Sequence, residues 1–172
     1  MSSYALRYSA FQMRIIYLFY LRIVNAKYQI MQLDKFTDYA LRILMTLAVQ
    51  GPERIPTSKI ASTFGLSDNH LSKVATQLAR EGFVNSERGR NGGLTLSRPA
   101  DQINIGSVVR AMKRDSPVVE CFGTDKSCLI LPACGLRSPL ALAQEAFFCT
   151  LDAYTLSDVT SPTAGLRTLL AR

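Results

Sequence analysis

The sequence predicts a mainly α-helical fold with one small β-hairpin. Three segments in the first two thirds of the chain repeat apolar residues at helical spacing, and turn residues separate them. Two short runs of alternating polar and apolar residues follow, with a glycine-rich loop between them. A further apolar repeat near the C-terminus predicts one longer helix. This order is that of a winged helix-turn-helix followed by a long helix.

The first predicted helix spans residues 34–49 and has Asp34 as its cap. A second spans 57–64, and a third runs from a cap at Ser67 to about Arg80. Glycines after each helix predict where it stops. The residues expected to face the core are Phe36, Ala40, Ile43, Leu44 and Leu47, then Ile60, Ala61 and Phe64, then Leu71, Val74, Ala75 and Leu78.

Two strands joined by a loop follow the third helix. Residues 83–86 and 94–97 alternate between apolar and polar side chains, and the loop between them carries Arg88 and Arg90 among glycines. A helix-turn-helix pattern alone has little specificity, but a hairpin directly after it favours a winged helix. We therefore assign residues 31–103 to one winged-helix unit.

Beyond this unit, residues 104–136 are expected to hold a short linker helix and then a loop with several prolines and glycines. Ser138-Pro139 predicts the start of the long helix, with a cap followed by proline at the first helical position. The helix is expected to end near residue 154, so that residues 137–172 comprise this helix and a tail.

The charge of the chain points to an anionic partner. The net charge of the 172 residues is +7, and the whole excess lies in residues 1–110, because residues 111–172 carry six basic and six acidic side chains. A basic surface kept only for solubility is the alternative.

The N-terminus suggests neither a membrane span nor export. Residues 1–30 contain an apolar run of seven residues between Arg14 and Arg22, far short of the roughly 20 that a bilayer requires. We interpret residues 1–30 as an extension upstream of the true start at Met31; a signal peptide and a basic surface helix are the alternatives. Four cysteines without a convincing export signal indicate reduced thiols and a cytoplasmic protein with no membrane partner.

In a winged helix the third helix enters the major groove of DNA, and its solvent face contacts the bases. Ser67 at the start of this helix is placed to hold a phosphate, and Arg88 and Arg90 on the thin wing suit a minor groove. A merely solvated polar face is the alternative for any single residue. The residues expected to contact the major groove are Asn69, His70, Ser72, Lys73, Thr76, Gln77 and Arg80.

Three cysteines in the predicted loop suggest a metal site. Six residues separate Cys121 from Cys128, and five separate Cys128 from Cys134. Structural zinc sites pair ligands about two to four residues apart, which these gaps match poorly. Iron–sulfur clusters accept thiolates at wider spacing and are favoured, with thiols that bind no metal as the alternative. Cys149 is interpreted as a packed thiol of the long helix.

Catalysis is not indicated. The sequence offers neither paired acids nor a Cys/His arrangement, and an electron carrier would leave the polar helix face unexplained. Asp38 is spaced from Arg42 for an ion pair on the surface of the first helix, and spacing alone favours that role.

Several motifs together resemble the Rrf-type winged-helix iron–sulfur regulators, and among them the nitric-oxide-sensing repressors. The resemblance covers residues 31 to about 160 and is specific in combination. The motifs are Met31-Gln-Leu-Asp-Lys-Phe-Thr-Asp-Tyr-Ala-Leu-Arg42, Arg88-Gly-Arg-Asn-Gly-Gly93, Ile105-Gly-Ser-Val-Val-Arg110, Cys128 with Pro132-Ala-Cys-Gly-Leu136, and Tyr154-Thr-Leu-Ser-Asp158.

The resemblance implies a homodimer, crossed through the long helix, that represses nitrosative-stress genes from a double-stranded DNA operator until nitric oxide arrives. It implies that Cys121, Cys128 and Cys134 bind the cluster, with Asp38 of the partner subunit as a fourth ligand. A 4Fe–4S cluster is favoured over a 2Fe–2S cluster. It also implies that Arg88 enters the minor groove. The first gap of six departs from the commoner five. A regulator of iron or iron–sulfur supply, and a winged helix without a cluster, therefore stay open.

Overall fold

The computed structural model describes most of the chain from Leu33 onward, within the unit Leu33–Arg172. The described residues are 33–89, 92–113, 118–123, 127–161 and 163–170. The predicted N-terminal extension, the predicted start at Met31 and the wing residue Arg90 lie outside them. Among the described helices, none has both the length and the apolar character that a membrane span requires.

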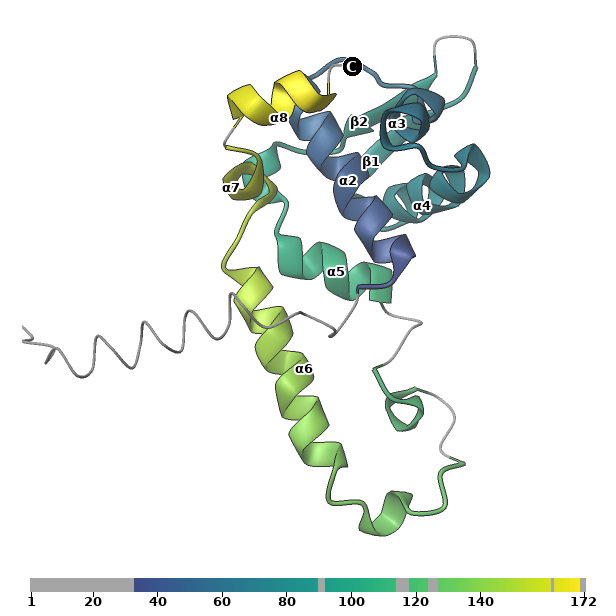
Figure 1. Ribbon diagram of the computed structural model, residues 1–172, viewed down its shortest axis with the longest axis vertical. Coiled ribbons are helices and arrows are strands. Elements are labelled where there is room, and N and C mark those ends of the chain that lie inside the picture. The colour runs from purple at the N-terminus through teal and green to yellow at the C-terminus, as the bar shows by residue number, and fades with distance from the viewer. Residues whose placement is uncertain (1–32, 90–91, 114–117, 124–126, 162, 171–172) are drawn as a thin grey trace, which may run out of the picture. The chain divides into compact units, whose positions relative to one another are not determined.

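Three helices and a hairpin form the first part of the described chain (Figure 1). They are α2 (Lys35–Gln50), α3 (Thr57–Phe64), α4 (Asp68–Arg80), β1 (Val84–Glu87) and β2 (Gly93–Leu96). The strands pair antiparallel, with Glu87 opposite Gly93. A bridge between Ile55 and Leu94 attaches the hairpin to the loop before α3. These elements confirm the predicted mainly α fold with a small β-hairpin.

Local signals in the sequence account for the ends of these helices. The Asp34 carboxylate accepts a hydrogen bond from the Thr37 N–H at 2.9 Å and so caps α2, as predicted. Gly65 ends α3 with φ at 63°, a conformation that glycine adopts without a Cβ clash. Ser67 occupies the N-cap position of α4, but its side chain makes no capping hydrogen bond.

The second part of the described chain is a series of helices separated by loops. It consists of η1 (Ala100–Gln102), α5 (Ile105–Lys113), η2 (Glu120–Phe122), η3 (Leu131–Ala133), α6 (Arg137–Asp152), α7 (Leu156–Thr160) and α8 (Thr163–Leu170). The predicted start of the long helix was wrong, because α6 begins at Arg137 rather than after a cap at Ser138. Pro139 therefore stands in the first turn, where backbone N–H groups have no partner within the helix and proline is tolerated. The helix ends at Asp152, slightly earlier than expected.

The two short helices of the tail, α7 and α8, were not predicted. A capping box starts α7: the Thr155 hydroxyl accepts from the Asp158 N–H at 3.2 Å, and the Asp158 carboxylate accepts from the Thr155 N–H at 2.8 Å. The backbone hydrogen bond from Thr155 also holds the pKa of Asp158 below its usual value. The tail returns to the core, because the Gln50 amide donates to the Leu170 carbonyl at 3.1 Å.

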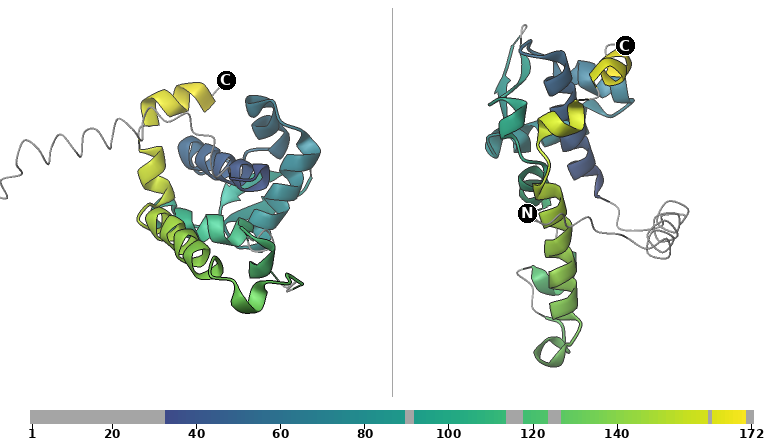
Figure 2. Two further views of the ribbon diagram at one scale, coloured as in Figure 1. Left: turned by 60° about the horizontal axis from the view of Figure 1, so that its bottom comes forward. Right: turned by 90° about the vertical axis from the view of Figure 1, so that its left-hand side faces the viewer.

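The core gathers around α2, which packs against α4, α5, α7 and α8 (Figure 2). The predicted inward-facing residues of α2, α3 and α4 are buried in it, with two exceptions. Phe36 is 36% exposed, and Phe64 is half-buried at the edge of the core. Periodicity gives the direction of a side chain about the helix axis, but not whether a neighbouring element reaches that turn.

Candidate DNA interface and cysteine loop

The helix expected to contact DNA bases, α4, is buried on one side and polar on the other. Leu71, Val74, Ala75 and Leu78 are buried, which leaves the predicted contact residues on the opposite face. Most of these are exposed, but Gln77 is half-buried and its amide donates to the Glu81 carboxylate at 3.0 Å. The exposed members of the predicted set on and beside α4 are Ser67, Asn69, His70, Ser72, Lys73, Thr76 and Arg80.

The wing is anchored at its base and carries Arg88 exposed beyond it. Ile55 and Leu94 exchange two backbone hydrogen bonds, of 3.0 and 2.8 Å. Gly93 fits against this bridge only without a side chain, since a Cβ there would lie 2.6 Å from the Ile55 carbonyl oxygen. Arg54 forms an ion pair with Glu87, whose negative charge lies directly before Arg88.

A depression of about 310 Å³ joins the wing to α3 and α4. It brings the predicted contact residues Ser72, Thr76 and Arg88 to one surface. The start of α3 contributes Thr57 and Ser58, which were not predicted as contact residues. Hydroxyl groups and backbone N–H groups at a helix start are common ligands for DNA phosphates, so the N-terminus of α3 was the signal available in the sequence.

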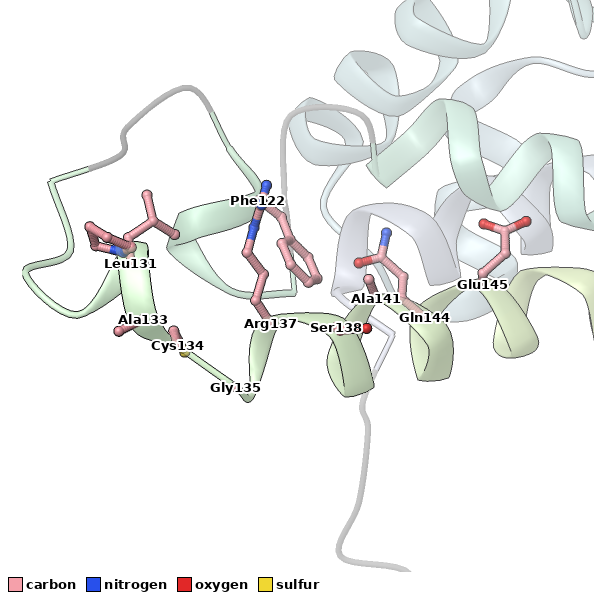
Figure 3. Close-up of a pocket in the computed structure, with 11 residues that line it drawn as sticks. Phe122, Leu131, Ala133, Cys134, Gly135, Arg137, Ser138, Ala141, Gln144 and Glu145 are labelled. Carbon is pink, nitrogen blue, oxygen red and sulfur yellow. The ribbon is translucent and has the colours of Figure 1, made fainter.

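The three cysteines lie between α5 and α6, and all of them are free thiols. Cys128 is exposed, whereas Cys121 and Cys134 are partly covered. Cys134 lines an open depression of about 910 Å³ together with Phe122 and the first turns of α6 (Figure 3). The structure thus places Cys134 beside α6, while the other two cysteines do not line this depression.

The donor chemistry of this loop fits an iron–sulfur cluster. Three thiols that form no disulfide are available, and thiolates are the ligands that such clusters use. Among the described residues, however, no three Cys, His, Asp or Glu side chains converge into a ready metal site. The donor set and its assembly into a cluster therefore both stay predictions.

Asp38 and Arg42 form the ion pair that their spacing favours, with the carboxylate 2.8 Å from the guanidinium. Both side chains are partly exposed, and the Arg42 guanidinium also lies 5.4 Å from the centre of the Phe64 ring. Within one protomer Asp38 thus has a cationic partner on its own helix. Its role as a cluster ligand stays a prediction.

A contact that was not predicted ties the start of α2 to the end of α5. The Lys113 ammonium donates to the Asp34 carboxylate at 3.0 Å, directly before the segment that leads into the cysteine loop. Partial burial raises the pKa of Asp34, but hydrogen bonds from the Thr37 N–H and from Lys113 outweigh it and hold the pKa below its usual value. The pair is 79 residues apart in sequence, beyond the reach of local patterns.

The interpretation of Cys149 as a packed thiol was wrong. Its side chain is exposed on α6, where the thiol lies 3.6 Å from the Glu145 carboxylate. Only Phe148 of this helix is fully buried, so α6 has few positions at which a side chain could be packed within one protomer.

Comparison with known proteins identifies a family and relatives. The model of the Rrf2 family, described as an iron-dependent transcriptional regulator, matches residues 33–162. The HTH-type transcriptional regulator NsrR of Geobacillus kaustophilus is 43% identical over 142 residues, covering 81% of this chain and 97% of the relative. NsrR of Bacillus subtilis is 42% identical with the same coverage.

Solved structures agree with the fold. CymR, the global cysteine regulator of Bacillus subtilis, superposes with a TM-score of 0.59 at 27% identity, covering 78% of this chain and 99% of CymR. IscR of T. potens superposes with a TM-score of 0.56 at 23% identity, covering 79% of this chain and 90% of IscR, and supports the fold alone. The predicted winged-helix class is confirmed.

Proposed function

The chain belongs to the Rrf2 family of transcriptional regulators, as an NsrR-like member, and we propose that it is a dimeric cytoplasmic repressor that senses nitric oxide through an iron–sulfur cluster. Its relatives are named HTH-type transcriptional regulators. The observation that carries the proposal is the loop between α5 and α6, where three free thiols follow a winged helix. Genes that answer nitrosative stress would be its targets.

Binding to DNA would use the polar face of α4 and the wing. The exposed side chains of α4 offer amide, hydroxyl and ammonium groups to base edges and phosphates in a major groove. Arg88 lies beyond the anchored base of the wing, where a guanidinium can enter a narrow minor groove. In a dimer, two α4 helices would meet half-sites about one helical turn apart.

The exposure of α6 supports a second copy of this chain as its partner. Leu142, in the second turn of α6, is 69% exposed, and Leu136, directly before the helix, is 61% exposed. The helix itself buries only Phe148. Exposed leucines on and beside a helix that buries so little of its surface favour an interaction surface there. A homodimer that crosses through α6 would cover them.

Cys121, Cys128 and Cys134 would hold the cluster, with Asp38 of the partner subunit as a fourth ligand and 4Fe–4S favoured over 2Fe–2S. When bound, the cluster supplies iron that nitric oxide can attack. A carboxylate in the fourth position would leave its Arg42 partner, so Asp38 would exchange one electrostatic contact for another. The cysteine loop would in either state determine how Phe122 and Cys134 pack against the first turns of α6.

The proposal is tested with protein purified without oxygen, before and after stoichiometric nitric oxide. The probe is a DNA duplex selected from a random library by the untreated protein. Affinity for this duplex is expected to fall about 100-fold, near 2.7 kcal/mol, in gel-shift titrations. Buffer saturated with nitrogen is the control. Equal binding before and after nitric oxide would refute the proposal.

The six-residue gap between Cys121 and Cys128 favours one further candidate, a regulator that answers iron or iron–sulfur supply. Such a protein would release or change its DNA in response to an iron chelator and would be indifferent to nitric oxide. A winged helix without a cluster would show negligible iron and no visible absorption. Iron analysis and absorption spectra of the same oxygen-free sample separate these cases.

Replacement of Arg88 by Ala is expected to weaken binding to the selected duplex about tenfold, near 1.4 kcal/mol, because the wing loses the guanidinium that is proposed to enter the minor groove. The slope of log affinity against log salt should fall by about one if the guanidinium also displaces a counterion. Arg167→Ala, which removes the same charge from α8, is the matched control and should bind like the wild type. Equal losses in both variants would exclude a specific role for Arg88.

A further inference from the structure

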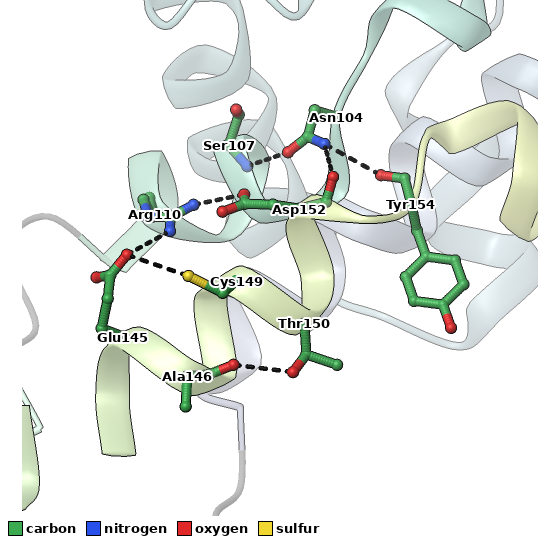
Figure 4. Close-up of polar contacts among 9 residues, drawn as sticks. All are labelled: Asn104, Ser107, Arg110, Glu145, Ala146, Cys149, Thr150, Asp152 and Tyr154. Atoms are coloured by element: carbon green, nitrogen blue, oxygen red, sulfur yellow. Dashed lines mark hydrogen bonds and ion pairs between the residues drawn. The ribbon is translucent and has the colours of Figure 1, made fainter. Parts of the chain in front are cut away.

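Arg110 joins α5 to the second half of α6 (Figure 4). Its guanidinium donates to the Glu145 carboxylate at 3.0 Å and to the Asp152 carboxylate at 2.5 Å. It also lies 4.7 Å from the centre of the Phe148 ring, in the range of a cation–π contact. One side chain of α5 therefore holds three residues that span two turns of α6.

Gly106 of α5 and Asn104 directly before this helix complete the contact. We call the contact the α5–α6 junction; its residues are Asn104, Gly106, Arg110, Glu145, Phe148 and Asp152. A Cβ on Gly106 would lie 2.0 Å from the Asp152 carboxylate and 2.9 Å from its backbone nitrogen, so glycine allows the helices to approach. The Asn104 amide donates to the Asp152 carbonyl at 2.7 Å. The second half of α6 is thus fixed to α5.

The first half of α6 has no comparable support. Of residues 137–144, only Leu140 and Gln144 are half-buried, and the others are exposed. This half meets the cysteine loop across the open depression that Phe122 and Cys134 line (Figure 3). The side-chain amide oxygen of Gln144 is buried without a hydrogen-bond partner among the described residues. An open depression therefore separates part of the loop from this half of α6, which also has one buried polar atom without a partner.

These two halves make α6 a helix that is fixed to α5 at one end and meets the cysteine loop across an open depression at the other. Its 16 residues span about 24 Å, so a shift of the loop at Arg137 becomes a tilt about the junction. Val108 and Val109 of α5 are completely buried in the core that also contains α4. Because α5 is fixed in the same core as α4, a tilt of α6 on α5 also changes the angle between α6 and α4.

We propose that Arg110 is a positioning residue that holds the hinge of α6 and thereby couples the state of the cysteine loop to DNA affinity. The inference rests on the proposed function, because it names the route by which that loop acts. Without the guanidinium, the angle between α6 and α5 is no longer fixed, so a change in the cysteine loop no longer shifts the partner subunit in a fixed direction. Arg110 therefore determines how much nitric oxide changes the affinity for DNA, and the fold does not depend on it.

The test compares wild type, Arg110→Gln, Arg110→Lys and the control Arg167→Gln as purified holo-proteins. The readout is the ratio of dissociation constants for the selected duplex after and before nitric oxide. We expect about 100-fold for wild type and for Arg167→Gln, and below about tenfold for Arg110→Gln. Arg110→Lys should lie between them, because an ammonium lacks the planar fork that serves two carboxylates. An unchanged ratio in Arg110→Gln, with equal iron content, would overturn the inference.

Hydrogen–deuterium exchange decides the role of Arg110 without the sensing reaction. In metal-free protein, Arg110→Gln should raise exchange in residues 145–152 and leave the amides of α4 unchanged. Gly106→Ala, which forces the helices apart, should do the same. Unaltered exchange in 145–152 would also overturn the inference. A wild type that ignores nitric oxide refutes the proposed function alone, since the exchange result still stands for the junction.

Discussion

Cys128→Ser is expected to abolish the iron–sulfur cluster and with it high-affinity DNA binding. The serine hydroxyl stays protonated where a thiolate is needed, so the loop retains only two of its three predicted protein thiolates. Cys128 is exposed and belongs to no helix or strand, so the fold should not depend on it. Purified without oxygen, the variant should lack visible iron–sulfur absorption and bind the selected duplex about 100-fold more weakly, near 2.7 kcal/mol.

The fourth cysteine provides the matched control for this experiment. Cys149 is also an exposed thiol, but it lies on α6 outside the cysteine loop. Cys149→Ser should keep the absorption, the iron content and the DNA affinity of the wild type. A Cys128→Ser protein with an intact spectrum would remove Cys128 from the ligand set. Loss of the cluster in both variants would indicate general damage rather than ligation.

Leu71→Ala is expected to destabilise the fold by about 2–5 kcal/mol, because it leaves a cavity under α4. Leu71 has no exposed surface and belongs to the core that joins α4 to α2 and α5. This loss is a large part of the roughly 5–15 kcal/mol by which a typical domain is stable. Denaturant titration followed by circular dichroism at 222 nm measures it.

Ser72, the next residue on α4, provides the matched control for the loss of stability. Ser72 is exposed and lines the depression beside the wing, so Ser72→Ala should change the free energy of unfolding by less than about 0.5 kcal/mol. Similar losses in both variants would contradict the assignment of a buried and a polar face to α4. A stable Leu71→Ala protein would place the core elsewhere.

Sequence periodicity predicted the winged helix well, because its signals are local. The buried stripe of α4, the cap at Asp34 and the turn at Gly65 depend on neighbours within one or two helical turns. The start of α6 was misplaced because proline is tolerated throughout the first turn, and not only at its first position. Thr155 and Asp158, which form the capping box of α7, are a local signal for the start of this helix.

The candidate site also has features that local sequence patterns predict and features that depend on tertiary contacts. Its residue types were evident in the sequence, since cysteine spacing and a polar helix face need no neighbour to be recognised. The ligand set and the individual DNA contacts remain predictions. The depression that joins Thr57 and Ser58 to the wing could not be predicted, because it forms where three elements meet.

The order of the elements and the two sides of α4 follow from residues close together along the chain, and local patterns in the sequence are therefore sufficient to predict them. The cysteine spacing is a local pattern as well, and the cluster that it predicts stays a prediction. Three ion pairs depend instead on tertiary packing: Lys113 with Asp34, Arg54 with Glu87, and Arg110 with Asp152. Each of these pairs joins residues at least 33 positions apart. Such contacts form only when packing of the apolar faces brings distant segments together. Periodicity predicts which face of a helix is apolar, but it does not predict which other segment packs against that face.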